Sequence, residues 1–217
     1  MEDLAPFLLP NRYVDSDHPA IVSFAQQTAG GLAPRHAAIA LYRVVREHLR
    51  YNPWRVYFTE DAYRASEVLQ RDPAEGGHCI DKALLLAAAG RAVGIPTRMH
   101  YANVRNHVGT AKLEEALGTD LLVFHGYTEL HLGGRWVAAT PAFNAALCAK
   151  MGVAPLEFDG VNDSIFQEHG REGGRFMEYI TDHGAHAGVP FTLMISEWEA
   201  HYPHLARRRR WADRPEG

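Results

Sequence analysis

Residues 76–86 read GGHCIDKALLL and place one cysteine, Cys79, between a glycine-bearing loop and a strongly apolar segment. The apolar character continues to Val93, after which Gly94 can close a helix and Pro96 cannot continue one. A helix that is apolar almost all round is buried in the protein. We therefore predict a buried helix that begins at Cys79.

The start of a helix is a favourable place for a reactive thiol. Unpaired backbone N–H groups and the helix dipole stabilise an anion there by about 0.3 to 1 kcal/mol, which lowers a thiol pKa. Gly76 and Gly77 would let the backbone approach a substrate closely. Cys79 is therefore the candidate nucleophile, and the alternative is a small buried cysteine that only packs.

Composition limits the classes of protein to consider. The 217 residues are 47% hydrophobic, which suits a single domain over residues 1–217. Two cysteines, Cys79 and Cys148, cannot form a disulfide framework, and no signal peptide or membrane-spanning stretch is evident, so we expect a cytoplasmic protein without a membrane partner. A net charge of −4 argues against nucleic-acid binding, and the basic cluster Arg207–Arg210 is interpreted as a solvated tail.

Hydrophobic periodicity and turn residues predict a helical first half and a strand-rich second half. Beyond Asn144 the pattern is mixed, and no element is predicted there. The further predicted helices are Pro19 to about Thr28, Pro34 to His48 and Thr110–Leu117, and a short segment near Ser66–Leu69 precedes the Cys79 loop. The predicted strands are Thr97–Tyr101, Leu121–Leu132 and Arg135–Thr140.

The last two strands form a predicted hairpin whose register can be worked out. With Gly133-Gly134 as a two-residue loop, Glu129 faces Ala138 and Tyr127 faces Thr140. Side chains two residues apart share a face, so His125, Tyr127, Glu129 and Thr140 project to the same side. A histidine beside a thiol can act as general base and then as general acid, although a lone strand histidine is more often structural. We expect His125 to be that base.

Two segments resemble those of a known family. Residues 77–98 (GHCIDKALLLAAAGRAVGIPTR) and 125–137 (HGYTELHLGGRWV) resemble the cysteine and histidine segments of the transglutaminase-like superfamily. The resemblance covers about residues 33–144. It implies a papain-like α+β fold, with N-terminal helices packed on an antiparallel sheet and a Cys-His-Asp triad.

The resemblance also implies an activity. Its members cleave or transfer amide acyl groups through a thioester, and some members have lost catalysis. For this chain it implies a cysteine-dependent hydrolase or acyltransferase, without a cofactor, acting on a peptide, amide or small-molecule acyl substrate. Hydrolysis or small-molecule chemistry is favoured over protein cross-linking because the chain is small. A catalytically inactive binding module is the alternative.

One position departs from the family pattern. Where the family usually has the triad aspartate, this chain has Thr140, which can hydrogen-bond an imidazole ring but carries no charge to stabilise its protonated form. Three arrangements remain open: a Cys-His dyad oriented by Thr140, a triad completed by Glu129 or Asp159, or a fold without catalysis.

An acyl-transfer site also needs hydrogen-bond donors for the oxyanion. The backbone N–H of Cys79 is the first candidate, and the indole N–H of Trp54 is a possible second, with an aromatic anchor for the loop as its alternative. His78 and Tyr127 are further supporting candidates because of their positions beside Cys79 and on the histidine strand.

Thirteen histidines raise a rival hypothesis of metal binding. Residues 182–186 read DHGAH, and their two histidines could recruit Cys79 or His125 to a zinc ion. The spacing is unspecific and lacks a glutamate-bearing zinc motif. We therefore rank a His-rich metal-binding protein third and assign no metal ligands.

Overall fold

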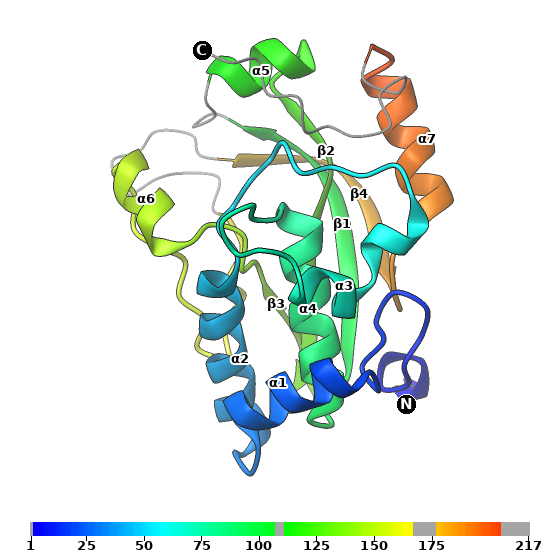
Figure 1. Cartoon of the computed structure of the whole chain (residues 1–217), viewed down its shortest axis with the longest axis vertical. Coiled ribbons are helices and arrows are strands. Elements are labelled where there is room, and N and C mark those ends of the chain that lie inside the picture. Colours follow the sequence, from blue (N-terminus) through cyan, green and yellow to red (C-terminus); the bar gives the residue numbers. More distant parts are fainter. Residues whose placement is uncertain (1, 107–110, 167–176, 205–217) are drawn as a thin grey trace.

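The computed structural model describes residues 2–106, 111–166 and 177–204, and within them helices pack against a four-stranded antiparallel sheet (Figure 1). This is the α+β class that the sequence predicts. Two short 3-10 helices, Ala5–Phe7 and Glu60–Tyr63, accompany the α-helices and β-strands. The α-helices and β-strands, in chain order, are α1 (Pro19–Ala29), α2 (Pro34–His48), α3 (Ala65–Leu69), α4 (Cys79–Ala92), β1 (Thr97–Asn106), α5 (Ala111–Leu117), β2 (Leu121–Leu132), β3 (Arg135–Ala139), α6 (Ala145–Met151), β4 (Met177–His186) and α7 (Phe191–His201).

Helix α4 is the centre of the fold. Its side chains from Ile80 to Arg91 are all buried, as the apolar sequence predicts, because the sheet covers one side and α1, α2 and α3 cover the others (Figure 1). The Thr128 hydroxyl on β2 donates to the Ala83 carbonyl at 2.7 Å and ties the helix to the sheet. The position of the first turn of α4 is therefore set by contacts on every side.

The hairpin has the predicted register. Glu129 pairs with Ala138, and both Gly133 and Gly134 have left-handed φ angles, of 59° and 84°. Strand β3 ends at Ala139, one residue earlier than predicted, so Thr140 begins a loop. There its N–H donates to the Ser164 carbonyl at 2.8 Å.

The sheet order is β3-β2-β1-β4, and this order includes elements that the sequence does not reveal. Strand β1 continues five residues past the predicted Tyr101, and β4 pairs along its other edge. β4 lacks a clear alternation between buried and exposed positions, which explains why a period-two pattern misses it. Helices α6 and α7 also lie in the unassigned region.

Two predictions fall partly or wholly outside the described residues. They are Thr110, the first residue of the predicted helix Thr110–Leu117, and the Arg207–Arg210 cluster. Among the helices that the structure describes, none has the length and apolar character needed to cross a membrane.

Candidate active site

Helix α4 begins at Cys79, and its first turn is closed by a reciprocal cap. The His78 N–H donates to Asp81 Oδ2 at 3.0 Å, and His78 Nδ1 lies 3.2 Å from the Asp81 backbone nitrogen. Asp81 is fully buried and pairs with Arg71 at 2.8 Å. Burial alone would raise the pKa of Asp81, but the charges of His78 and Arg71 lower that pKa to about 2. The cap therefore fixes where the cysteine sits.

The two glycines before His78 pack against the protein's own backbone. A Cβ on Gly76 would lie 2.1 Å from the Arg50 carbonyl oxygen, and Gly77 forms a parallel bridge with Tyr51. This differs from the predicted role in substrate approach, because the space beside them is filled by residues 50–52. They place the loop that carries Tyr51 beside the start of α4.

Gly126 brings strand β2 against the cysteine. A Cβ there would lie 3.0 Å from Ile80 Cγ1 and 3.2 Å from Tyr101 Cε1, so only glycine permits this approach without movement. The Gly126 N–H hydrogen-bonds the Cys79 sulfur. The sequence contains the signal, a glycine inside a predicted strand, but the partner becomes evident only in the structure.

The His125 side chain lies on the face of β2 opposite to the one that Gly126 presents to Cys79. Gly126 and Thr128 face α4, so His125 faces away from it, and its ring lies 5.8 Å from that of Phe166. Cys79 packs against both apolar clusters of the protein, including the one that contains Phe166. The β2–β3 pairing stops at Thr128, so no described strand pairs with this edge of β2 at residue 125. Cys79 and His125 line the same cavity, the cysteine from the start of α4 and the histidine from β2.

The predicted pair lines a common cavity of about 60 Å³. His78 lines it too, and aromatic or apolar side chains form most of the remaining wall. Those include Tyr51, Pro53, Val56, Leu113, Leu117, Leu122, Phe124, Trp198 and Tyr202. A thiol and an imidazole in a small, mostly apolar hollow are suited to nucleophilic chemistry shielded from water.

The protonation states of the pair differ from expectation. Burial raises the pKa of the Cys79 thiol to about 11, although the Gly126 N–H lowers it, and the negative charge of Asp81 raises it further. The predicted lowering of this pKa is therefore wrong, because desolvation outweighs the helix terminus. Burial, helped by the charge of His78, lowers the pKa of His125 to about 4. At neutral pH the resting pair is an uncharged thiol and an uncharged imidazole.

Three polar atoms of the predicted site residues are buried without a hydrogen-bond partner among the described residues. They are His125 Nε2, His78 Nε2 and Thr140 Oγ1. The predicted hydrogen bond from Thr140 to the His125 ring is therefore not formed in this conformation. Leaving a buried polar atom unpaired costs about 1–3 kcal/mol, so such atoms call for an explanation, and a catalytic role is one.

The proposed alternative carboxylates are engaged elsewhere. Glu129 pairs with Arg98 and lies 3.3 Å from His100 Nδ1, and His100 stacks on Tyr127 at 4.8 Å. Asp159 is exposed and accepts hydrogen bonds from the backbone of residues 161 and 162. Within the described part of the chain, no carboxylate contributes to the pKa of His125. Neither Glu129 nor Asp159 therefore completes a triad here, and Tyr127 supports His100.

Trp54 lies in a neighbouring cleft and is not among the residues that line the Cys79 cavity. Its backbone N–H donates to Asn52 Oδ1 at 3.0 Å, and its ring packs against the core. These contacts agree with the loop-anchoring alternative. Tyr51, which the sequence did not single out, is the aromatic residue that lines both the cavity and the cleft.

The histidines of residues 182–186 serve local contacts. His183 Nε2 lies 2.9 Å from Asn103 Oδ1, and His186 Nε2 lies 3.0 Å from the His183 carbonyl oxygen. Across residues 2–106, 111–166 and 177–204, no three histidine, cysteine, aspartate or glutamate side chains are arranged to hold a metal ion.

A comparison with known protein families agrees with the resemblance seen in the sequence. A family model described as "Transglutaminase-like superfamily" matches residues 22–141. The chain is similar to a crystal structure described as a "Putative Cysteine Protease" from Cytophaga hutchinsonii, at 23% identity and a TM-score of 0.49. That match covers 65% of this chain and 43% of the other, so it spans less than half of that protein. No curated protein matches.

Proposed function

Because the chain belongs to the transglutaminase-like superfamily, we propose that it is a cysteine-dependent enzyme that cleaves or transfers an amide acyl group through a thioester on Cys79. The substrate is a peptide, amide or small acyl compound. The small cavity supports hydrolysis or transfer to a small amine over the cross-linking of two proteins. Two unpaired cysteines suit a reducing compartment such as the cytoplasm.

One observation carries this proposal. The buried Nε2 of His125 has no partner among the described residues, although His125 lines the same cavity as Cys79. A purely structural histidine would satisfy this nitrogen, because an unpaired one costs stability. A general base, in contrast, needs a ring nitrogen that is free to accept the proton of the nucleophile.

The uncharged resting pair defines the order of events. His125 takes the thiol proton as sulfur attacks the carbonyl carbon, because the high pKa of Cys79 leaves almost no thiolate beforehand. The carbon–nitrogen bond then breaks, and His125 gives the proton to the departing amine. Water or a second amine attacks the thioester, loses a proton to His125, and the proton returns to sulfur as the acyl group leaves.

The developing oxyanion has donors close by. The backbone N–H of Cys79 stands at the start of α4, where helix N–H groups are unpaired. We propose His78 Nε2 as the second donor, since this atom is buried without a partner among the described residues and His78 lines the cavity. The short contact of His78 Nδ1 with Asp81 holds the ring in place.

Acyl-enzyme trapping tests the proposed chemistry. Incubation with an activated ester such as p-nitrophenyl acetate should add one acetyl group to Cys79, seen by mass spectrometry, with a burst of p-nitrophenol. Cys79→Ser and His125→Gln should each abolish the burst. Cys148→Ser is the matched control, because Cys148 is the other free cysteine, is buried on α6 and is not among the residues that line the cavity. Acetylation that persists in Cys79→Ser would contradict the assignment.

A non-catalytic binding module is the second candidate. The raised pKa of the Cys79 thiol favours it, and so does the finding that no carboxylate among the described residues acts on His125. It predicts slow alkylation of Cys79 by iodoacetamide with no dependence on residue 125. The enzyme hypothesis predicts that His125→Gln slows that alkylation at pH 8 by about tenfold or more, within the range for general-base assistance.

A further inference from the structure

A second and larger hollow adjoins the Cys79 cavity. Its volume is about 590 Å³, within the usual range for ligand sites. Tyr51 and Pro53 line both hollows, so the two are neighbours. We call the larger one the α6 cleft; its walls are residues 50–55, Ala74, Glu75, Asn144, Ala146, Leu147 and Lys150.

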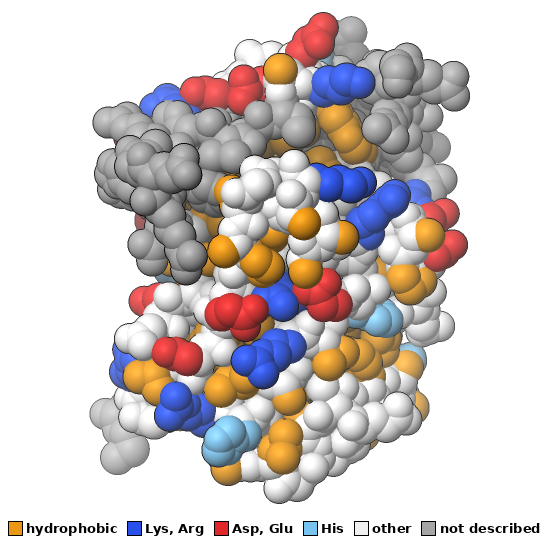
Figure 2. Space-filling view, turned by 90° about the vertical axis from the view of Figure 1, so that its left-hand side faces the viewer, with side chains coloured by type: hydrophobic (Ala, Val, Ile, Leu, Met, Phe, Trp, Pro, Cys, Tyr) orange, Lys and Arg blue, Asp and Glu red, His pale blue; other side chains and the backbone are white. Residues whose placement is uncertain are grey.

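Positive charge predominates in the α6 cleft. Three cationic side chains, Arg50, Arg55 and Lys150, line it together with one acidic side chain, Glu75. Arg55 forms an ion pair with Glu75 and neutralises it. Within the part of the chain that the structure describes, no carboxylate lies at ion-pair distance from Arg50 or Lys150. Figure 2 shows the face on which α6 lies, with Lys and Arg side chains in its upper right part and others, interspersed with Asp and Glu, across its lower half.

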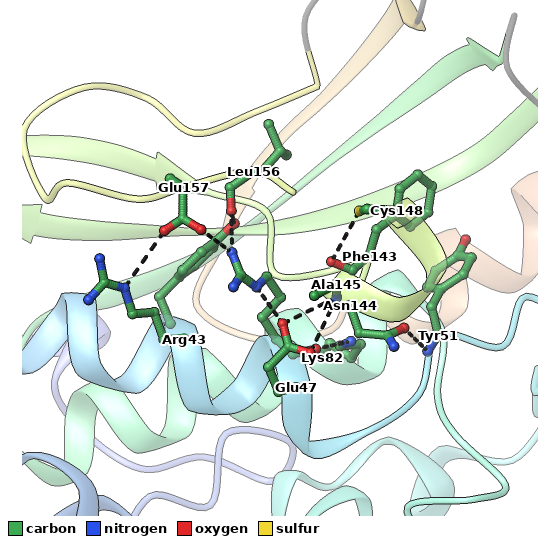
Figure 3. Close-up of polar contacts among 12 residues, drawn as sticks. Arg43, Glu47, Tyr51, Lys82, Phe143, Asn144, Ala145, Cys148, Leu156 and Glu157 are labelled. Carbon is green, nitrogen blue, oxygen red and sulfur yellow. Dashed lines mark hydrogen bonds and ion pairs between the residues drawn. The ribbon is translucent and has the colours of Figure 1, made fainter. Parts of the chain in front are cut away.

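The cleft wall is firmly attached to the rest of the protein. Asn144 Oδ1 accepts from the Tyr51 N–H at 3.2 Å, and the Glu47 carboxylate accepts from the Ala145 N–H at 3.3 Å (Figure 3). The buried Lys82, one turn after Cys79 on α4, donates to the Arg46 and Leu49 carbonyls at 2.8 Å each. The end of α2, the start of α6 and the cysteine helix are therefore held in one arrangement, which preorganises the cleft relative to Cys79.

We propose that the α6 cleft binds a carboxylate of a peptide substrate while the amide to be cleaved reaches Cys79 past Tyr51. This substrate class rests on the proposed function. The two unpaired cations attract an anion, and the side chains of Trp54 and Leu147 offer apolar surface to the rest of the peptide. An extended acidic peptide can occupy both hollows, with its carboxylate in the cleft and a small apolar group beside Cys79.

Binding to the inactive Cys79→Ala variant separates this proposal from catalysis. The probes are three N-acetyl pentapeptide amides that differ only in one residue, Glu, Gln or Lys, and isothermal titration at low and high salt gives their affinities. We expect the Glu peptide to bind about tenfold more tightly than the Gln peptide at low salt, with a smaller difference at high salt. Equal affinities, or no binding of any of the three peptides, would overturn the proposal.

Charge reversal locates the subsite. In the Cys79→Ala background, Lys150→Glu and Arg50→Glu should each remove the preference for the Glu peptide, and the double variant should prefer the Lys peptide. Arg135→Glu is the matched control, because Arg135 is equally exposed but lies at the start of β3, outside the cleft. A preference that survives the double variant would refute the site. A Glu preference without acyl-enzyme formation in the wild type would instead refute only the proposed catalysis.

Discussion

Replacing Gly126 by alanine tests the contact that brings β2 to the cysteine. The new Cβ would lie 3.0 Å from Ile80 Cγ1 and 3.2 Å from Tyr101 Cε1, both shorter than ordinary contacts, and 3.4 Å from Ile80 Cα. Overpacking of this kind costs about 1–3 kcal/mol, which for a chain of this size lowers Tm by about 2–12 °C.

The same change should slow the alkylation of the Cys79 thiol. Ile80 follows Cys79 directly, so moving α4 away from β2 weakens the hydrogen bond from the Gly126 N–H to sulfur. That bond favours the thiolate, and losing about 1.4 kcal/mol of such stabilisation reduces the thiolate population about tenfold. Iodoacetamide alkylation of Cys79 at pH 8, followed by mass spectrometry below Tm, measures this rate.

Gly90→Ala provides the matched control. Gly90 is also buried on α4, and a Cβ there would lie 2.7 Å from Thr97 Cγ2, three turns away from the thiol. It should lower Tm to a similar extent and leave the alkylation rate unchanged. The reasoning about this contact fails if Gly126→Ala lowers Tm but its Cys79 is alkylated at the wild-type rate. It also fails if the alkylation rate falls equally in both variants.

Three further predictions concern buried polar groups. Thr140→Val removes a buried hydroxyl that has no partner among the described residues, so it should raise the free energy of unfolding by about 1 kcal/mol in urea titrations. If Thr140 orients His125 during turnover, kcat should fall in Thr140→Val and stay near the wild-type value in Thr140→Ser. The pKa of His125 is about 4 in the folded protein and about 6.5 in the unfolded chain, so the unfolded chain binds more protons between these pH values. The free energy of unfolding should therefore fall by about 3 kcal/mol from pH 6.5 to 4. In His125→Gln this part of the pH dependence should be absent. The pKa of Asp81 is about 2 in the folded protein, so the ionised carboxylate contributes fully to the free energy of unfolding above about pH 4. About 2 kcal/mol of that contribution should be lost as the pH falls to 2, and Asp81→Asn should not show this loss.

Local patterns predicted the elements whose residues carry a strong periodic signal. The buried helix after Cys79 and the hairpin with Gly133-Gly134 have the predicted limits to within a residue or two. Their apolar faces and turn glycines act within a few residues of each other along the chain, which is why a sequence pattern records them. β4 was missed because it forms by pairing with β1, about 80 residues earlier, and not from a pattern of its own.

The site shows the same division between local and distant contacts. Side-chain alternation correctly grouped His125, Tyr127 and Glu129 on one face of β2. It could not reveal that Arg98 and His100 from the neighbouring strand engage Glu129. Competition among charged partners from different strands decides which carboxylate is available, and that competition depends on the sheet order.

The sequence by itself determined that a cysteine begins a buried helix, that a histidine hairpin follows, and that both segments resemble those of one superfamily. Only the tertiary structure decided the state of the thiol. The helix terminus that favours a thiolate is visible in the sequence, but the desolvation that opposes it comes from side chains distant in sequence, such as Tyr51, Phe124 and Trp198, which line the cavity. The structure also decided that Cys79 and His125 share this cavity and that the positively charged α6 cleft adjoins it, because close packing at Gly126 and Gly76 brings these segments together.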